Sequence, residues 1–133
     1  MDLRIEPSSK TPVSTQLRDR IAAAIGGGRL LPGDRLPTVR ALAEELGLAA
    51  NTVARAYREL ESAGWIVGRG RRGTFVADTL PSAPDEAEAR LAAAADRFAR
   101  RARQLGFGSA RALGEIRRAV REHGSRAGGR SPG

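Results

Sequence analysis

Two short helical patterns joined by a tight turn constrain the fold of this chain more than any other feature of its sequence. Thr38 can cap the first pattern, whose apolar residues recur at helical spacing: Val39, Leu42, Ala43 and Leu46. Gly47 can adopt the left-handed conformation that ends a helix, and only two residues precede the next pattern. That pattern begins near Ala50, ends at Gly64 and turns one apolar side inward: Val53, Ala56, Tyr57 and Leu60. We therefore expect a helix-turn-helix.

A third helical pattern precedes this pair. Thr11 and Pro12 suit the N-cap and the first position of a helix, and the run Gly26-Gly27-Gly28 ends it. Its inward residues are Val13, Leu17, Ile21, Ala24 and Ile25. The prolines in Leu30–Pro37 exclude a helix there and favour a turn between short extended pieces.

The residues after Gly64 predict a β-hairpin. Trp65–Val67 and Thr74–Val76 are rich in β-branched and aromatic side chains, and Gly68–Gly73 between them contains only Gly and Arg. A hairpin with a cationic tip that follows a helix-turn-helix is a wing. We therefore expect a mostly α fold with a small β part, in which residues 1–78 form a winged helix-turn-helix domain.

The remaining residues predict a short two-helix C-terminal tail. Prolines and small residues indicate a linker at 79–86, and two amphipathic helices are expected within 87–123. Their apolar stripes consist of Leu91, Phe98, Leu105, Leu113, Ile116 and Val120. Helices this short need a partner, so the stripes pack either against a second copy, as a dimerisation surface, or against the first helix of the same chain. Residues 124–133 are mainly Gly, Arg and Ser and are expected to be disordered.

The polar side of the helix that begins near Ala50 carries groups that can read DNA. Asn51, Arg55 and Arg58 share one side at helical spacing, with Thr52 beside them. In the major groove, Arg can bind guanine and Asn can bind adenine in bidentate fashion, while Thr can contact a base or a phosphate. Because most exposed polar helix faces are only solvated, this interpretation depends on the neighbouring elements.

Basic residues near that helix favour a DNA interface. The hairpin tip carries three arginines and a closing glycine: Arg69, Arg71, Arg72 and Gly73. Such a tip can approach phosphates or place an arginine in a narrow minor groove. Arg40 can donate to a phosphate, because the first helix of a helix-turn-helix crosses the DNA backbone. Arg35 either contacts DNA or pairs with Asp34 or Glu44, and the sequence leaves both open.

The composition supports a nucleic-acid partner and excludes several other classes. The chain has 23 Lys and Arg against 15 Asp and Glu, a net charge of +8 that favours a polyanion or simply a soluble surface. The lack of cysteine excludes disulfides, zinc fingers and thiol nucleophiles. His123 lies among polar residues and is not poised as a general base. We expect a cytoplasmic protein that is not an enzyme and has no metal, no cofactor and no membrane association.

Several motifs in order resemble the GntR family of bacterial regulators over residues 10–77. They are Pro32-Gly33-Asp34-Arg35-Leu36-Pro37-Thr38-Val39-Arg40, Leu42-Ala43, Gly47, Asn51-Thr52-Val53-Ala54-Arg55-Ala56-Tyr57, Leu60-Glu61 and Gly73-Thr74-Phe75-Val76. The resemblance implies a winged helix-turn-helix in which Arg40, Asn51, Thr52, Arg55 and the wing residues approach an operator. This chain departs from the pattern at Ala49-Ala50, which leaves the helix from Ala50 without a side-chain N-cap.

The short tail is similar to that of the YtrA subfamily, and this resemblance implies dimerisation through the tail and repression of the protein's own operon with neighbouring transporter genes. The predicted function is a sequence-specific repressor that binds an inverted repeat in double-stranded DNA as a homodimer. The alternative is a winged-helix module that binds DNA without sequence preference or binds another protein. The tail is too short to enclose a ligand, so the existence of a small-molecule effector stays open.

Overall fold

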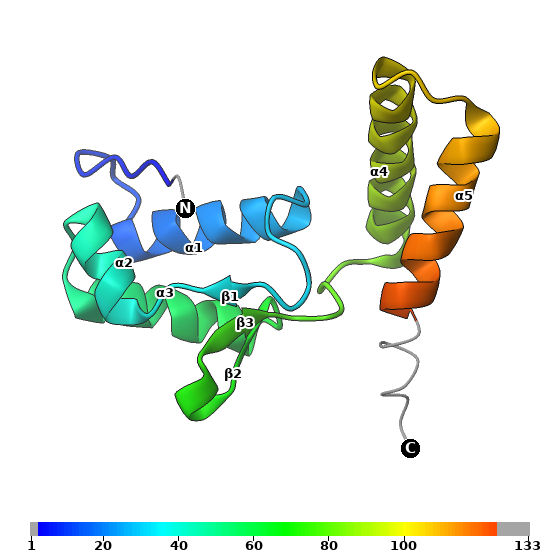
Figure 1. Ribbon diagram of the computed structural model, residues 1–133. Coiled ribbons are helices and arrows are strands. Elements are labelled where there is room, and N and C mark those ends of the chain that lie inside the picture. The colour runs from blue at the N-terminus through cyan, green and yellow to red at the C-terminus, as the bar shows by residue number, and fades with distance from the viewer. Residues whose placement is uncertain (1–2, 125–133) are drawn as a thin grey trace. The chain divides into compact units, whose positions relative to one another are not determined.

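The computed structural model describes residues 3–124, and its N-terminal unit combines three helices with one small sheet (Figure 1). The helices are α1 (Val13–Gly26), α2 (Val39–Leu46) and α3 (Ala50–Ser62). The strands are β1 (Arg35–Leu36), β2 (Ile66–Gly68) and β3 (Thr74–Val76), and the 3₁₀ turn η1 (Gly70–Arg72) joins the last two. The predicted mostly α fold with a small β part, a winged helix-turn-helix, is confirmed.

The ends of α2 are the ones that the sequence predicts. The Thr38 hydroxyl accepts a hydrogen bond from the Ala41 N–H at 3.0 Å, which satisfies one of the free donors of the first turn. Gly47 ends the helix with a φ of 67°, a left-handed conformation that glycine adopts without a steric penalty. The turn to α3 is therefore short, and α3 begins at Ala50 without a side-chain cap.

The start of α1 differs from the prediction. Pro12, and not Thr11, is the N-cap, and the helix begins at Val13. The Pro12 carbonyl accepts the N–H groups of Thr15 and Gln16, whereas the Thr11 carbonyl accepts the Gln16 side-chain amide at 2.8 Å. The polar side chain of Gln16 thus holds the segment before the helix, and Thr11 has no capping role.

One apolar core joins the three helices and the sheet. The largest side chains that are fully buried come from α1, α2, α3 and β2: Leu17, Ile21, Leu42, Val53, Leu60 and Ile66. Every residue predicted to face inward from α3 is buried in this core. Since burial of such side chains is worth about 1.5 to 3 kcal/mol each, the core determines how α3 is rotated about its axis.

The sheet contains one strand more than the predicted hairpin. β3 lies between β1 and β2 and runs antiparallel to both, so Phe75 pairs with Arg35 on one side and with Val67 on the other. The sequence predicts only an extended piece at β1, because its two residues are too few to carry a strand pattern. In β1, Leu36 is buried and Arg35 is exposed.

The C-terminal unit begins at Ala83 and contains α4 (Pro84–Gln104), α5 (Ser109–Ala119) and the π-helical turn η2 (Val120–Gly124). α4 starts at Pro84, inside the predicted linker and earlier than residue 87, because proline suits the first position of a helix and Asp85 and Glu86 favour its first turn. Gly124 lies in η2, and the disorder predicted for the rest of the tail falls at 125–133, outside the described residues.

The two tail helices have no buried core of their own. Neither α4 nor α5 contains a buried residue, and the six predicted dimerisation residues are all exposed: Leu91, Phe98, Leu105, Leu113, Ile116 and Val120. Phe107, between the helices, is also exposed and was not predicted. No helix in residues 3–124 is long and apolar enough to cross a membrane.

Tyr57 connects α3 to the segment before α2. Its hydroxyl donates to the Pro37 carbonyl at 2.7 Å, and the residue is 6% exposed. Burial, and then the negative charge of Glu45, raises the pKa of Tyr57 to about 12 from an ordinary value of 10. The phenol therefore stays protonated in the folded protein under conditions that ionise it in the unfolded chain.

This pKa difference predicts a loss of stability in alkali. Below pH 10 the contribution of Tyr57 is complete, and between about pH 10 and 12 the free energy of unfolding falls by roughly 2 kcal/mol as the unfolded tyrosine ionises first. Tyr57 and Trp65 are the only residues of their kinds, so tyrosinate absorbance reports the titration and tryptophan fluorescence reports unfolding. Tyr57→Phe is the control, and an equal loss of stability over this range in that variant would contradict the assignment.

Candidate nucleic-acid interface

The outer side of α3 carries the four residues that the sequence singles out. Asn51, Arg55 and Arg58 are exposed, and Thr52 is half-buried. They face outward because the apolar residues of the same helix are buried against α1 and α2. Asn51, Thr52 and Arg55 line one surface hollow of about 290 Å³, whose other wall is the start of α1 at Val13 and Ser14.

Arg55 is held by an ionic network that the sequence does not predict. Its Nε donates to one oxygen of Glu59 at 3.4 Å, and Arg18 of α1 donates to the other oxygen at 3.1 Å. Arg18 also pairs with Asp19 at 3.0 Å, so an acid lies on each side of its guanidinium. The Asp19 carboxylate first, and Glu59 after it, raises the pKa of Arg18. Glu59 thereby limits where the Arg55 side chain can point.

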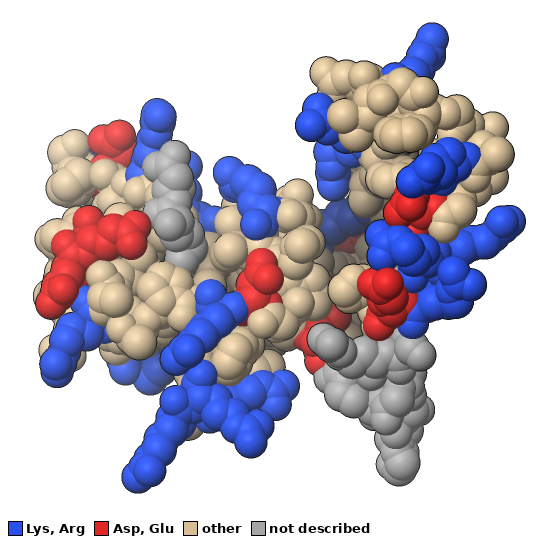
Figure 2. All heavy atoms as spheres, viewed as in Figure 1, with Lys and Arg blue, Asp and Glu red and all other residues tan. Residues whose placement is uncertain are grey.

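The wing places its basic residues at an exposed tip. Arg69, Arg71 and Arg72 are all exposed, and Figure 2 shows Lys and Arg side chains gathered over this hairpin. The turn is closed by backbone hydrogen bonds, including Arg69 N–H to the Gly73 carbonyl at 2.8 Å. Its base is tied to α3, because the Gly68 N–H donates to the Glu61 carboxylate at 3.1 Å. The motif that contains Glu61 is visible in the sequence, but this contact is not.

Arg35 lies under the wing. Gly73 has a φ of 113°, and a Cβ built on it would stand 2.7 Å from Nε of Arg35. Arg35 is exposed and makes no ion pair with Asp34 or Glu44 within residues 3–124; the Asp34 carboxylate instead accepts the Leu31 N–H at 2.8 Å. Among the described residues the Arg35 guanidinium therefore has no acidic partner, and it lies beside Gly73.

The predicted interface residues thus come from separate elements. Asn51, Thr52 and Arg55 share one hollow, and Arg58 lines a second one with Arg55. The wing arginines and Gly73 lie on the hairpin that Glu61 joins to α3, and Arg40 is exposed in the first turn of α2. Together these surfaces present guanidinium, amide and hydroxyl donors.

Comparison of the sequence with protein families and with characterised proteins gives consistent matches. Residues 13–76 match the family model described as bacterial regulatory proteins, gntR family. The chain is 50% identical over 105 residues to the HTH-type transcriptional regulator Rv1152 of Mycobacterium tuberculosis, which covers 79% of this chain and 83% of that protein. It is 38% identical to the HTH-type transcriptional repressor YtrA of Bacillus subtilis, over 57% of this chain and 58% of the repressor.

Solved structures with a similar fold include proteins of the same kind. YtrA from Sulfolobus acidocaldarius, a GntR-family transcription factor, matches with a TM-score of 0.56 and 40% identity, over 59% of this chain and 82% of that one. The DNA-binding domain of AraR in complex with operator ORX1 matches with a TM-score of 0.51 and 29% identity, over 58% of this chain and 99% of that one.

The positive φ of Gly73 predicts the cost of a side chain at this position. Gly73→Ala lowers the free energy of unfolding by about 1 to 3 kcal/mol, because an L-residue is strained at this backbone conformation. In the background Arg35→Ala the same change has the same cost to within about 0.5 kcal/mol in a double-mutant cycle measured by urea unfolding, because the guanidinium is the end of a flexible, exposed side chain and moves aside easily.

Gly70→Ala is the matched control in the same turn. Gly70 has a φ of 59° but open space around it, so its substitution costs about 1 to 2 kcal/mol from backbone strain alone and is independent of Arg35. A cost of Gly73→Ala that falls by clearly more than about 0.5 kcal/mol in the Arg35→Ala background would contradict this, because it would show that the Arg35 side chain cannot move aside.

Proposed function

Because this chain belongs to the GntR family of bacterial regulatory proteins, in which it is a DNA-binding transcription regulator and not an enzyme, we propose that it is a repressor that binds an inverted-repeat operator as a homodimer. The observation that carries the proposal is the outward side of α3, where Asn51 and Arg55 project from a helix whose other side is locked into the core. A helix of this kind fits the major groove.

In the proposed complex α3 reads bases. Arg55 and Arg58 supply guanidinium forks for guanine, Asn51 supplies an amide for adenine, and Thr52 contacts a base edge or a phosphate. Arg55 exchanges its long contact with Glu59 for a base, while the shorter bond from Arg18 keeps Glu59 in place. The ionic network thus orients the Arg55 side chain, but it costs little free energy to break.

The wing and α2 bind phosphates in this proposal. Arg69, Arg71 and Arg72 approach the backbone or a minor groove at the tip, with Gly73 letting the chain turn closely, and Arg40 donates to a phosphate from α2. These contacts contribute affinity for any sequence and fix the register of α3. The DNA-binding domain of AraR is in complex with operator DNA, which supports binding of an operator here.

The relatives support repression and action in the cytoplasm. A relative of 38% identity is named a transcriptional repressor, and a regulator bound across a promoter blocks polymerase by occupying its site. Such a protein works in the cytoplasm, where the bacterial chromosome lies. No effector is assigned, and the proposal requires none.

Dimerisation is proposed to occur through the tail. Phe98, Leu113 and Ile116 line an apolar hollow of about 700 Å³ between α4 and α5, together with Phe107. Leu91, Leu105 and Val120 extend the exposed apolar surface on either side. Because neither helix buries any residue by itself, the groove has the chemistry of an interface that the same groove of a second copy would cover.

The base-reading role of α3 predicts a loss of specificity in Arg55→Ala. Its affinity for an operator selected from a random pool falls by about 1 to 3 kcal/mol, whereas its affinity for random duplex changes little, because a base contact is lost. Arg71→Ala/Arg72→Ala weakens binding to both duplexes alike. It also reduces the slope of log affinity against log salt concentration by about 1 for each phosphate contact that is lost. Fluorescence anisotropy across a salt series measures both effects.

Equal losses of Arg55→Ala on operator and random DNA would contradict base reading. A wild-type protein with no preference for any duplex in the pool would replace the proposal by the alternative of an architectural or protein-binding module, since a specific regulator binds its operator about 10³-fold or more above random DNA.

The apolar groove predicts the oligomeric state. Wild type sediments as a dimer, and Phe98→Ser/Ile116→Ser weakens the dimer at least about tenfold because two large apolar side chains are lost from the interface. Leu31→Ser, which removes an exposed apolar side chain from the N-terminal unit, is the control and leaves the dimer intact. A monomeric wild type that is destabilised by the Phe98 and Ile116 substitutions would instead show packing within one chain.

A further inference from the structure

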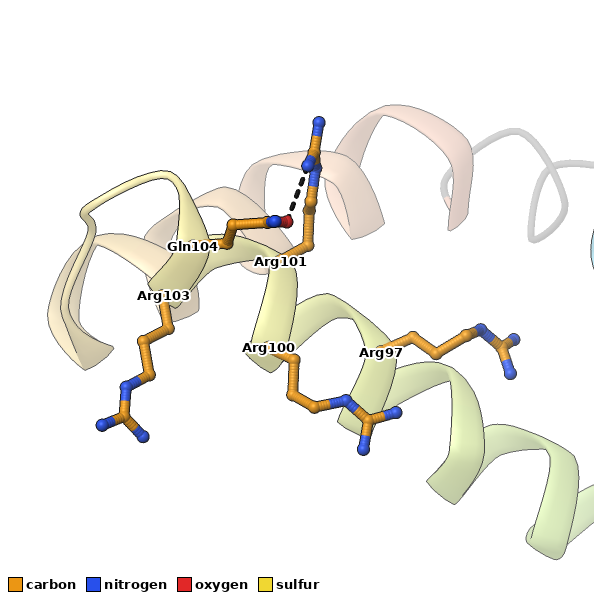
Figure 3. Close-up of a pocket in the computed structure, with 5 residues that line it drawn as sticks. All are labelled: Arg97, Arg100, Arg101, Arg103 and Gln104. Carbon is orange, nitrogen blue, oxygen red and sulfur yellow. Dashed lines mark hydrogen bonds between the residues drawn. The ribbon is translucent and has the colours of Figure 1, made fainter.

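Four arginines gather in the last two turns of α4 and form a basic surface that the proposed function does not use. This α4 arginine patch consists of Arg97, Arg100, Arg101 and Arg103 (Figure 3). With Gln104 they line an open hollow of about 510 Å³ on the outside of the helix. Figure 3 shows Arg97, Arg100 and Arg103 extending away from the helix, whereas Arg101 donates to the Gln104 side chain at 2.7 Å.

The four patch arginines make no ion pair within residues 83–124, which is also true of Arg117 and Arg121. Arg90, Arg111 and Arg118 in the same range each pair with a glutamate. The spacings of three and four residues among the patch arginines bring like charges together on the helix surface, which is unfavourable unless an anion lies between them.

The helix dipole explains only part of the patch. Cations are favoured in the last turn of a helix, which accounts for Arg101 and Arg103. Arg97 and Arg100 lie before that turn, where the effect of the dipole has faded. The dipole therefore does not account for these two residues.

The patch lies on the side of α4 that the proposed dimer leaves uncovered. With about 3.6 residues per turn, Arg97 and Arg100 fall roughly opposite Phe98, Ala95 and Ala102, which line the apolar groove. Arg97 and Arg100 do not line that groove, although Arg103 borders it. A second copy seated in the groove would therefore leave both guanidinium groups in solvent.

We propose that the α4 arginine patch binds the phosphate backbone of the same duplex, outside the base pairs that α3 reads. The inference rests on the proposed function for the presence of DNA at the N-terminal unit. Arginine forks match phosphate oxygens, and an open surface suits an extended polyanion better than a small ligand, which needs an enclosed pocket. Because the two units share one chain, DNA bound to the first is at high effective concentration for the second.

The experiment compares two variants that each remove two charges from the tail. Arg97→Gln/Arg100→Gln alters the patch without touching the apolar groove, and Arg117→Gln/Arg121→Gln, which removes two other arginines that make no ion pair within residues 83–124, is the control. Glutamine is a good helix former, so α4 and α5 persist in both. Affinities are measured across a salt series for a selected operator at minimal length and for the same operator extended by about 15 bp, one and a half helical turns, at each end.

Wild type and the control variant are expected to bind the extended duplex more tightly and with a steeper salt dependence than the minimal one. Arg97→Gln/Arg100→Gln is expected to lose about tenfold or more in affinity for the extended duplex, to lose about 0.9 in salt slope per phosphate contact, and to bind the minimal duplex as wild type does. The absence of any length dependence in wild type, or equal losses in both variants, overturns the inference.

Scrambled duplexes of both lengths separate this inference from the proposed function. If wild type fails to prefer the operator but still shows a length dependence that requires Arg97 and Arg100, the proposed function fails and the patch still binds DNA. Vesicles containing phosphatidylserine and a single-stranded RNA are tested in parallel. Loss of binding to either one by the patch variant, with DNA binding unchanged, overturns the inference in favour of that partner.

Discussion

The burial of one side of α3 determines which of its residues can meet a ligand. Val53, Ala56, Tyr57 and Leu60 are buried with the core residues of α1 and α2, so rotation of α3 about its axis would expose apolar surface. Three polar contacts then hold neighbouring segments of the chain against this helix. Tyr57 holds the segment before α2, Glu59 joins Arg55 to α1, and Glu61 holds the base of the wing. The outward direction of Asn51 and Arg55 follows from this packing rather than from any contact of their own.

The sequence predicts those parts of the fold and the site that depend on local pattern. The cap at Thr38, the left-handed Gly47 and the apolar period of α3 are local, and together they place the polar side of α3 correctly. What the sequence does not reveal depends on residues far apart along the chain. No periodicity pairs Arg18 with Glu59 or Arg35 with Gly73, and β1 is a strand only because β3 passes beside it. At Pro84 two local signals compete, since proline both ends linkers and begins helices.

The tail is built on a different principle from the N-terminal unit. Its helices satisfy their own backbone hydrogen bonds, but neither buries a side chain. Apolar residues line the groove between α4 and α5, while Arg97 and Arg100 lie on the other side of α4. A helix as short as α5, with 11 residues, is marginal in water without tertiary contacts. The stability of the tail is therefore linked to whatever covers the groove, and a concentration dependence of the tail's helicity follows if a second copy does so.

In the proposed complex, the distribution of arginines separates specificity from affinity. On α3, Arg55 and Arg58 lie near side chains that can distinguish bases, such as Asn51. The wing arginines lie among glycines instead. The arginines of α4 line an open surface in which Gln104 is the one other side chain that could read a base. Contacts to phosphate strengthen the binding of operator and random DNA by the same factor, so they leave the ratio between the two unchanged. Phosphate contacts from a second unit would thus lengthen the time spent on any duplex, while the choice among sequences stays with the few side chains that the core of the first unit turns outward.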